Sequence, residues 1–192
     1  MEDIMNRWQL AQQEERKHHS GTLEDGVEAY RESYRQYFSY LKTQPEQKGK
    51  IIMEIGCADV PALMFCENYA TSYIIEPLPS PILLELTKDL PITILVSPAE
   101  HLEFPVVDEV WLFNVLQHVI DPDVIIDKCK KAANVIRFFE PINDGVDLCH
   151  LHTFTLEYFQ KHFGNCVTHY PNHTGQVKNF HEHESAYGIW TK

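Results

Sequence analysis

The spacing of apolar residues changes near position 49 and divides the chain into two parts. Upstream, two helices are predicted: residues 3–17 are polar with a few apolar side chains, and residues 22–41 place their apolar side chains on one helical face. Downstream, short continuous apolar runs alternate with further helical patterns. The strand-like runs span 50–55, 71–75, 92–96, 107–113, 135–139, 166–170 and 186–190, and the helical patterns span 61–69, 80–90, 121–132 and 154–163.

This alternation predicts a doubly wound α/β fold with a mostly parallel sheet, because a helix between two strands returns the chain to the same edge. The last two strand-like runs have only a short connection between them, so we expect them to form an antiparallel pair. We expect two units, an N-terminal helical cap over residues 1–48 and an α/β domain over residues 49–192.

The second predicted helix carries an aromatic stripe. Tyr30, Tyr34, Tyr37 and Phe38 recur at spacings that place them on one face. Such a face is typical of a helix that packs on the rest of the domain. Two other interpretations are that the phenolic hydroxyls line a pocket beneath the helix, or that the stripe is the contact face of a homodimer.

Composition and charge exclude several partners. The 192 residues include 16 basic and 28 acidic side chains, which gives a formal net charge of −12. Nucleic acid and anionic membranes repel such a chain unless a basic patch is set apart, and we find no such patch. No apolar run reaches the roughly 18 residues that cross a bilayer. Five cysteines without a Cys-x-x-Cys pair predict free thiols in a reducing compartment, and therefore a cytoplasmic protein.

Acidic residues stand at the ends of the first two predicted strands. Glu54 precedes Gly56 at the end of the first strand, and Glu76 ends the second strand 22 residues later. Ligands of such sheets bind at the carboxyl ends of the strands, where an acidic residue on the second strand grips ribose hydroxyls. A glycine at the first turn lets the backbone approach a ligand closely. The pattern favours a nucleoside site, although Glu54 could instead cap the next helix and Glu76 could be an exposed strand end.

Two further segments carry a resemblance to a known family. The third strand is followed by S-P-A-E-H-L-E-F-P over residues 97–105, and the fourth by N-V-L-Q-H-V-I-D-P over residues 114–122. Together with the two strand ends, these segments resemble the class I S-adenosylmethionine-dependent methyltransferases, especially their small-molecule branch. The resemblance covers residues 50–163 and a compatible tail, and it implies a Rossmann-like, seven-stranded sheet with an antiparallel last strand. The pattern W-x-x-A-Q-x-x-E over residues 8–15 is similar to leader helices of some members.

The resemblance implies S-adenosylmethionine as the cofactor and a methyl transfer to a small or sugar-like acceptor, with O- and N-methylation both open. The residues that it assigns to the cofactor are Glu54, Gly56 and Ala58 at the methionine end, Glu76 at the ribose, Pro77, Ala99 and Glu100 at the adenine, and Asn114 and Val115 at the sulfonium end. Alignment of the reacting atoms supplies most of the acceleration in such a transfer.

Three histidines are candidate catalytic residues, because histidine is the default general base for an oxygen nucleophile. His118 lies in the loop after the fourth strand, and His150 and His152 follow the fifth. For His118 the alternative is packing or hydrogen bonding within its loop. Together with Glu140 and Asp144, His150 and His152 could instead bind the substrate or a divalent metal ion. The histidines at 181 and 183 allow the same interpretation. Paired histidines in loops are more often solvated, so we predict no metal site.

The sequence departs from the family pattern in ways that keep a second function open. Ala58 and Val60 occupy the second and third glycine positions, and Pro98 stands where an aspartate often accepts a hydrogen bond from adenine. The alternative is therefore a non-catalytic binding or scaffold domain that has lost or weakened cofactor binding. A nicotinamide-dependent dehydrogenase is disfavoured, because its fingerprint needs glycines that this chain lacks.

Overall fold

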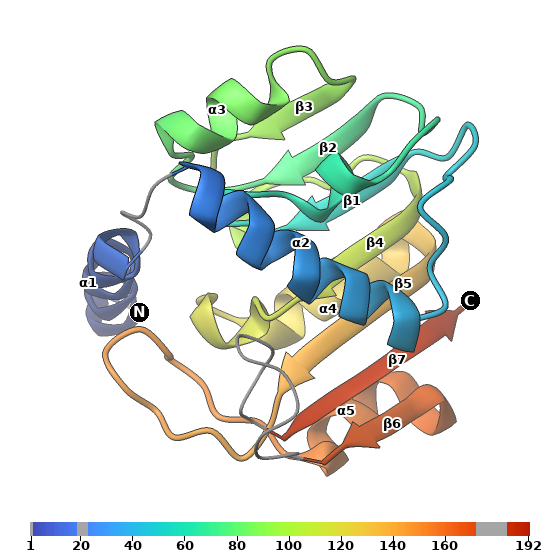
Figure 1. Cartoon of the computed structure of the whole chain (residues 1–192). Helices are drawn as coiled ribbons and strands as arrows, with labels where there is room; N and C mark the ends of the chain where they lie inside the picture. Colours follow the sequence, from blue (N-terminus) through green and yellow to red (C-terminus); the bar gives the residue numbers. More distant parts are fainter. Residues whose placement is uncertain (1, 19–22, 172–183) are drawn as a thin grey trace.

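The computed structural model describes residues 2–18, 23–171 and 184–192. Its strands are β1 (Ile52–Ile55), β2 (Ser72–Ile75), β3 (Ile92–Leu95), β4 (Val107–Phe113), β5 (Ala133–Pro141), β6 (Val167–Tyr170) and β7 (Ser185–Thr191). They form one seven-stranded sheet in the order β3-β2-β1-β4-β5-β7-β6 (Figure 1). β1 to β5 pair in parallel, and β7 runs antiparallel to its neighbours β5 and β6. The predicted Rossmann-like α/β fold with an antiparallel last strand is therefore confirmed.

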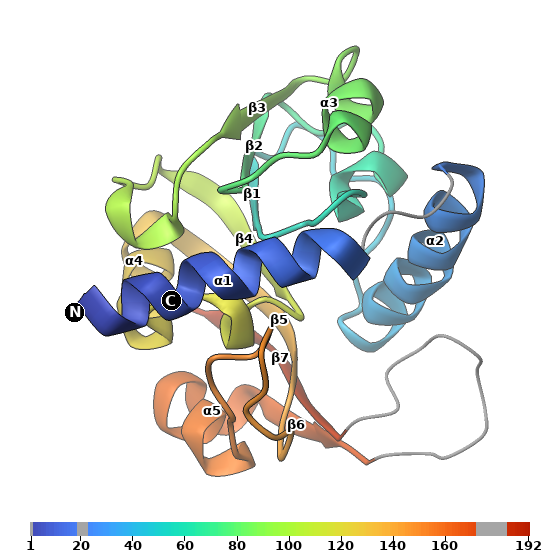
Figure 2. The ribbon, with the colours of Figure 1, turned by 90° about the vertical axis from the view of Figure 1, so that its left-hand side faces the viewer.

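Helices cover both faces of the sheet. The α-helices are α1 (Glu2–His18), α2 (Leu23–Tyr40), α3 (Pro81–Thr87), α4 (Pro122–Ala132) and α5 (Leu156–Phe163), and the short 3-10 helices are η1 (Ala62–Phe65), η2 (Ala99–His101), η3 (Leu116–His118) and η4 (Gly164–Cys166). α2 and α3 pack on one face, and α4 and α5 pack on the other. α1 lies apart from both layers, across the end of the sheet (Figures 1 and 2).

Alternate side chains of β4 enter two different cores, because successive residues of a strand point to opposite faces. Trp111 and Phe113 pack with α2, whereas Val110 and Leu112 pack with α4 and α5. Trp111 is fully buried, and the ring centroid of Phe113 lies 5.3 Å from that of Tyr37. Because both faces of β4 are covered, apolar side chains are favoured on both, which explains the continuous apolar run in its sequence.

The aromatic stripe of α2 faces this sheet. Tyr34, Tyr37 and Phe38 are 5, 4 and 7% exposed, and the Tyr34 hydroxyl donates to the Val60 carbonyl oxygen at 2.9 Å. The packing interpretation of the stripe is thus confirmed. A homodimer would have to use another surface, because the chain buries this one itself.

The predicted helix over residues 61–69 is wrong. Only the single 3-10 turn η1 forms there, and the chain then leaves the helical path. Instead, this segment forms backbone hydrogen bonds with the linker before β1. Glu67 N–H donates to Pro45 O at 2.9 Å, and Gln47 N–H donates to Glu67 O at 2.9 Å. These bonds draw residues 66–68 into an extended bridge with the linker, so the local helical pattern loses to tertiary pairing.

The other helix boundaries follow their capping residues. Ser80, Asp121 and Thr155 each accept a backbone N–H from the residue three positions on, at 3.1 to 3.3 Å. α5 ends at Gly164, whose φ is +67°, as its position after the helical pattern predicts. α3 is shorter than its sequence pattern over residues 80–90, since it starts at Pro81 and ends at Thr87.

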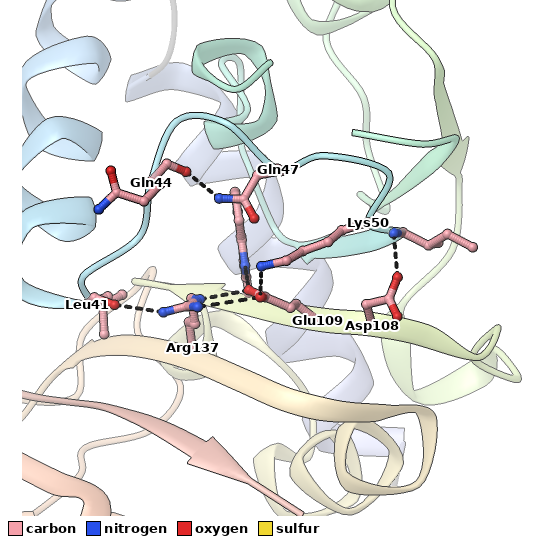
Figure 3. A network of polar contacts seen from close by, with 9 residues as sticks. Leu41, Gln44, Gln47, Lys50, Asp108, Glu109 and Arg137 are labelled. Carbon is pink, nitrogen blue, oxygen red and sulfur yellow. Dashed lines mark hydrogen bonds and ion pairs between the residues drawn. The ribbon is translucent and has the colours of Figure 1, made fainter. Parts of the chain in front are cut away.

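A buried ion network holds the amino ends of the central strands together (Figure 3). Glu109 of β4 is 3% exposed, and its carboxylate meets Lys50 Nζ at 2.6 Å and Arg137 Nε at 2.7 Å. The Trp111 indole N–H donates to the same carboxylate at 3.1 Å. Arg137 also donates to the Leu41 carbonyl oxygen at 2.7 Å, which ties the end of α2 to β5. These partners lower the pKa of Glu109 to about 2 despite its burial.

All five cysteines are free thiols, as their number and spacing predict. Cys57, Cys66 and Cys129 are buried, and burial raises the pKa of the Cys66 thiol to about 12. Such thiols behave as small apolar core residues rather than as nucleophiles. In the described parts of the chain, no helix combines the length and the apolarity needed to span a membrane.

Candidate functional site

A cavity of about 640 Å³ opens at the carboxyl ends of β1, β2 and β4. α1 passes in front of these strand ends (Figure 2) and contributes to the wall. The lining residues are Trp8, Gln12, Glu15, Tyr30, Ser33, Tyr34 and Tyr37 from α1 and α2, and residues 55–59, 75–82, 98–100, 113–115, 118 and 119 from the strand ends and their loops. A volume of this size is ordinary for a small-molecule or cofactor site.

The cavity gathers most of the site residues that the sequence predicts. Those that line it are Gly56, Ala58, Glu76, Pro77, Ala99, Glu100, Asn114, Val115 and His118. Glu54, His150 and His152 do not line it. Four segments that are well separated along the chain thus contribute residues to one cavity.

Gly56 is required at its position for two independent reasons. Its φ of +63° lies in the left-handed region that side chains with a Cβ rarely adopt. A Cβ added there would also lie 2.2 Å from Val115 Cγ2. The turn after β1 and the loop after β4 therefore touch directly, and only glycine permits that contact.

The two replaced glycine positions are accommodated differently. Ala58 keeps a left-handed backbone, with φ at +51°, which costs an alanine about 1–2 kcal/mol relative to the right-handed region. Val60 is 1% exposed and packs into the core. The loop therefore retains the path that glycines would favour, at a cost in strain at Ala58.

Glu54 lies beneath this loop. Its carboxylate oxygens accept the backbone N–H groups of Ala62 at 2.8 Å and Leu63 at 3.1 Å, and the residue is 1% exposed. Burial raises the pKa of Glu54 to about 7, although the two backbone bonds favour the charged form. The geometry matches the capping interpretation, and a direct contact between Glu54 and a cofactor stays a prediction.

Glu140, which the sequence groups with the acceptor-side residues, has the same task under the loop after β4. It is fully buried, and its Oε2 accepts the N–H groups of Val115 at 3.0 Å and Leu116 at 3.1 Å. Burial raises its pKa to about 8. Glu140 thereby holds the backbone next to Asn114, whose φ of +57° begins the turn.

The strand-two end of the cavity combines one carboxylate with apolar walls. Glu76 is 8% exposed, and its Oε1 accepts the N–H of Leu78 at 3.2 Å. Pro77, Leu78 and Pro98 supply apolar surface beside it. A flat base fits between such walls, while a carboxylate suits hydroxyl groups of a sugar.

Glu100, predicted at the adenine edge, has a structural task as well. Its Oε1 accepts the N–H groups of Ile120 at 2.7 Å and Asp121 at 3.0 Å. Lys128 of α4 in turn donates to the Glu100 carbonyl oxygen at 2.5 Å and to that of Leu102 at 2.7 Å. These bonds fix η2 against the start of α4, and with it the wall formed by Ala99.

His118 lines the cavity, but both of its ring nitrogens have protein partners. The amide nitrogen of Gln117 lies 3.2 Å from His118 Nε2, and the Cys149 carbonyl oxygen lies 3.2 Å from Nδ1. An amide NH₂ only donates and a carbonyl only accepts, so these partners select the tautomer with the proton on Nδ1. The Gln117 amide also donates to Asn114 Oδ1 at 3.1 Å. His118 thus orders the loop, and its role as a base stays a prediction.

The other two predicted histidines lie behind His118. His150 packs on the His118 ring, with centroids 4.9 Å apart, and its Nδ1 meets Asp147 at 3.2 Å. His152 Nε2 lies 2.9 Å from the Val119 carbonyl oxygen. Both fasten the loop after β5 to the loop after β4. The pair at 181 and 183 lies outside the described residues, and within them no three His, Cys, Asp or Glu side chains gather as metal ligands.

Several lining side chains that the sequence did not single out as site residues come from the two N-terminal helices. Trp8 is 8% exposed and shares a small apolar cluster with Ala11 and Leu151. Glu15, about two helical turns after Trp8, has its Oε2 3.8 Å from His118 Nδ1. The signals available were the leader-helix pattern over residues 8–15 and the interpretation of the tyrosine stripe as a pocket wall. Neither signal could place the helices over the strand ends.

Comparison with known proteins identifies the fold. No protein-family model and no curated protein matches the sequence significantly. Among solved structures, the N-methyltransferase NodS from Bradyrhizobium japonicum WM9, in complex with S-adenosylhomocysteine, superposes with a TM-score of 0.68 at 15% identity over 95% of this chain and 98% of its own. The magnesium protoporphyrin IX methyltransferase ChlM from Synechocystis PCC 6803, with bound S-adenosylhomocysteine, gives 0.64 at 10% identity over 93% and 94%.

A third structure, of the candidate RNA methyltransferase PH1948 from Pyrococcus horikoshii, gives a TM-score of 0.51 at 12% identity over 84% of this chain and 80% of its own. The three proteins act in different settings, so the likeness concerns the architecture rather than the acceptor. The chain has the Rossmann-like fold of the class I S-adenosylmethionine-dependent methyltransferases.

Proposed function

We propose that this protein is an S-adenosylmethionine-dependent methyltransferase with a small-molecule acceptor. The observation that carries the proposal is the convergence of Gly56, Glu76, Ala99 and Val115 on one cavity at the carboxyl ends of the parallel strands. Two solved structures of the same fold hold S-adenosylhomocysteine, the demethylated cofactor. When bound, S-adenosylmethionine supplies an electrophilic methyl group on a sulfonium ion.

The residues of the cavity fit this cofactor. Glu76 offers carboxylate oxygens to ribose hydroxyls, and Pro77 with Leu78 offers apolar surface to adenine. Among the described lining residues are four carboxylates and no Lys or Arg, which favours a ligand with a positive sulfonium centre. The loop positions are held before any ligand arrives, because Glu54 and Glu140 fix the backbone from below. Such preorganisation lowers the cost of binding.

The acceptor would occupy the part of the cavity under α1 and α2. Trp8, Tyr30, Tyr37 and Phe113 supply apolar surface there, and Gln12 and Glu15 supply polar groups. These helices contribute to the cavity wall, and we infer that they help to form the acceptor site. The size of the cavity supports a small acceptor, and the net charge of −12 disfavours a nucleic acid.

Calorimetric titration with S-adenosylhomocysteine tests the proposal. We expect saturable binding that Glu76→Ala weakens about tenfold or more, because it removes hydrogen bonds between a charged group and the ribose. Glu85→Ala, on the exposed surface of α3, is the matched control and should bind as wild type does. Absence of binding at millimolar ligand would instead favour the non-catalytic scaffold.

The role of His118 requires a separate test. Once an acceptor is identified, the pH–rate profile of His118→Ala should show whether a group that titrates near neutrality is lost. A lower rate with an unchanged profile is expected if His118 only orders the loop. Loss of the acidic limb of the profile, where protonation of a base lowers the rate, would identify His118 as the general base.

A further inference from the structure

The acceptor end of the cavity has an unusual combination of side chains. Its aromatic wall is formed by Tyr30, Tyr34, Tyr37 and Phe113. Their ring centroids are separated by 6.1 Å between Tyr30 and Tyr34, 5.9 Å between Tyr34 and Tyr37, and 5.3 Å between Tyr37 and Phe113. The rings therefore form one continuous surface rather than isolated contacts. Aromatic faces carry negative partial charge and attract cations.

Carboxylates from three elements converge on the same volume. Burial raises the pKa of the Tyr30 hydroxyl, and the charges of Asp59, Glu15 and Glu76 raise it further. All three carboxylates line the same cavity, although they come from the loop after β1, from α1 and from the residue after β2. Desolvated walls of this kind concentrate a negative potential.

The described lining residues offer little to balance that potential. They include no Lys or Arg, and His118 is the one residue among them that can become cationic. Its Nδ1 already lies 3.8 Å from Glu15 Oε2. Among the described lining residues, an acceptor with a phosphate or carboxylate would therefore meet carboxylates and no Lys or Arg, which raises the cost of its desolvation. An acceptor with an ammonium group would meet both carboxylates and aromatic side chains.

We propose, resting on the methyltransferase function above, that the acceptor is an amine whose cationic nitrogen is held by Glu15 against the aromatic wall of α2 and β4. Asp59 and Glu76 add to the field without needing to touch the acceptor. For transfer, the ammonium would first give one proton to Glu15, which passes it to water. The freed nitrogen lone pair would then form the bond to the methyl carbon as the methyl–sulfur bond breaks, and S-adenosylhomocysteine would leave, so the site needs no base stronger than a carboxylate. This selects N-methylation from the two reactions that the sequence leaves open.

Three probes of nearly equal shape test the charge preference directly. They are 2-phenylethylamine, 2-phenylethanol and phenylacetate, titrated by ligand-observed NMR against protein saturated with S-adenosylhomocysteine. We expect the amine to bind about tenfold more tightly than the other two, which corresponds to one favourable charge interaction. Equal binding of the three probes, or a preference for the alcohol or the anion, would overturn the proposal.

Two neighbouring variants test the assignment to Glu15. Glu15→Gln should abolish the preference for the amine, whereas Glu14→Gln, which removes the same charge outside the cavity lining, should retain it. Equal effects of the two substitutions, or none, would overturn the role of Glu15. Binding of S-adenosylhomocysteine is measured in the same samples. Its absence would overturn the proposed function, whereas its presence without amine preference would overturn this inference alone.

Discussion

Buried glutamates at the two ends of the central strands have different hydrogen-bonding partners, and their pKa values shift in opposite directions. Glu109, near the amino end of β4, is buried against Lys50 and Arg137, which lower its pKa to about 2. Glu54 and Glu140, at the carboxyl ends of β1 and β5, are buried against backbone N–H groups, and their pKa values rise to about 7 and about 8. The residue type and the burial are alike, so the partners decide the outcome.

The carboxylate at the amino end stabilises the fold, whereas the carboxylates at the carboxyl end position the loops of the cavity. Cations at the amino end create a fixed ion network that joins β1, β4, β5 and α2 (Figure 3). Backbone amides at the carboxyl end do not offset the burial of the carboxylates, whose pKa values stay raised, but they hold the loops that line the cavity. The amino end therefore contributes stability. The carboxyl end sets the geometry of the site, at an expense in stability that grows as pH rises from about 5 to about 8.

Breaking the ion network should have the largest effect. Glu109→Gln removes the counter-charge of the largely buried Arg137 and of the partly exposed Lys50, which costs about 3 kcal/mol of unfolding free energy. Urea denaturation measures the loss. Glu85→Gln breaks an exposed ion pair with Lys88 and should cost less than about 1 kcal/mol. A similar small loss for both variants would show that the network adds no cohesion.

Two glycines flank β1 and give the next comparison. Gly56→Ala forces a Cβ against Val115 and a side chain into left-handed backbone, so we expect a loss of about 2–4 kcal/mol and weaker S-adenosylhomocysteine binding. Gly49→Ala has a similar φ of +70° but nothing within 4 Å of its Cβ, and should lose only about 1 kcal/mol. Equal losses would mean that the contact between the two loops is dispensable.

The pH dependence of stability should distinguish the two kinds of carboxylate. Glu140 keeps its proton in the folded chain up to about pH 8, whereas an unfolded glutamate, with a reference pKa of 4.5, loses it much earlier. The folded state binds more protons in between, so this group's contribution to stability falls as pH rises from 5 to about 8, by at most about 1.4 kcal/mol per pH unit.

Denaturant titrations of wild type and Glu140→Gln across that range provide the measurement. The advantage of wild type over the variant should shrink with rising pH. For Glu109→Gln the sign is opposite, because the folded pKa is lowered: the wild-type advantage should shrink as pH falls below 4.5 toward 2. Parallel curves for wild type and Glu140→Gln would contradict the raised pKa.

The smallest expected effect concerns the strained alanine of the cofactor loop. Ala58→Gly relieves the left-handed backbone and should raise stability by about 0.5–1 kcal/mol, since part of the gain is offset by the greater entropy of an unfolded glycine. Ala29→Gly, within helix α2, should instead lose about 1 kcal/mol. Thermal denaturation of both variants gives the comparison, and a loss at Ala58 would show that its methyl group packs favourably.

Local patterns predicted the elements well wherever one residue sets the conformation. Ser80, Asp121, Thr155 and Gly164 mark helix ends because each satisfies backbone groups within its own few residues. The same reasoning fails over residues 61–69, where the partners that end the helical path come from the linker before β1. A one-dimensional pattern carries no signal for that pairing.

The sequence by itself determined the parallel α/β order, the positions of Gly56 and Glu76 at strand ends, and the acidic charge, because periodicity and residue type are local properties. Only the tertiary structure decided which carboxylates meet cations and which meet amides. Glu54, Glu109 and Glu140 look alike in the chain, and their pKa values diverge because the neighbours of each come from distant segments. The placement of α1 over the cavity, and of Glu15 beside His118, was likewise decided by packing between segments about 100 residues apart.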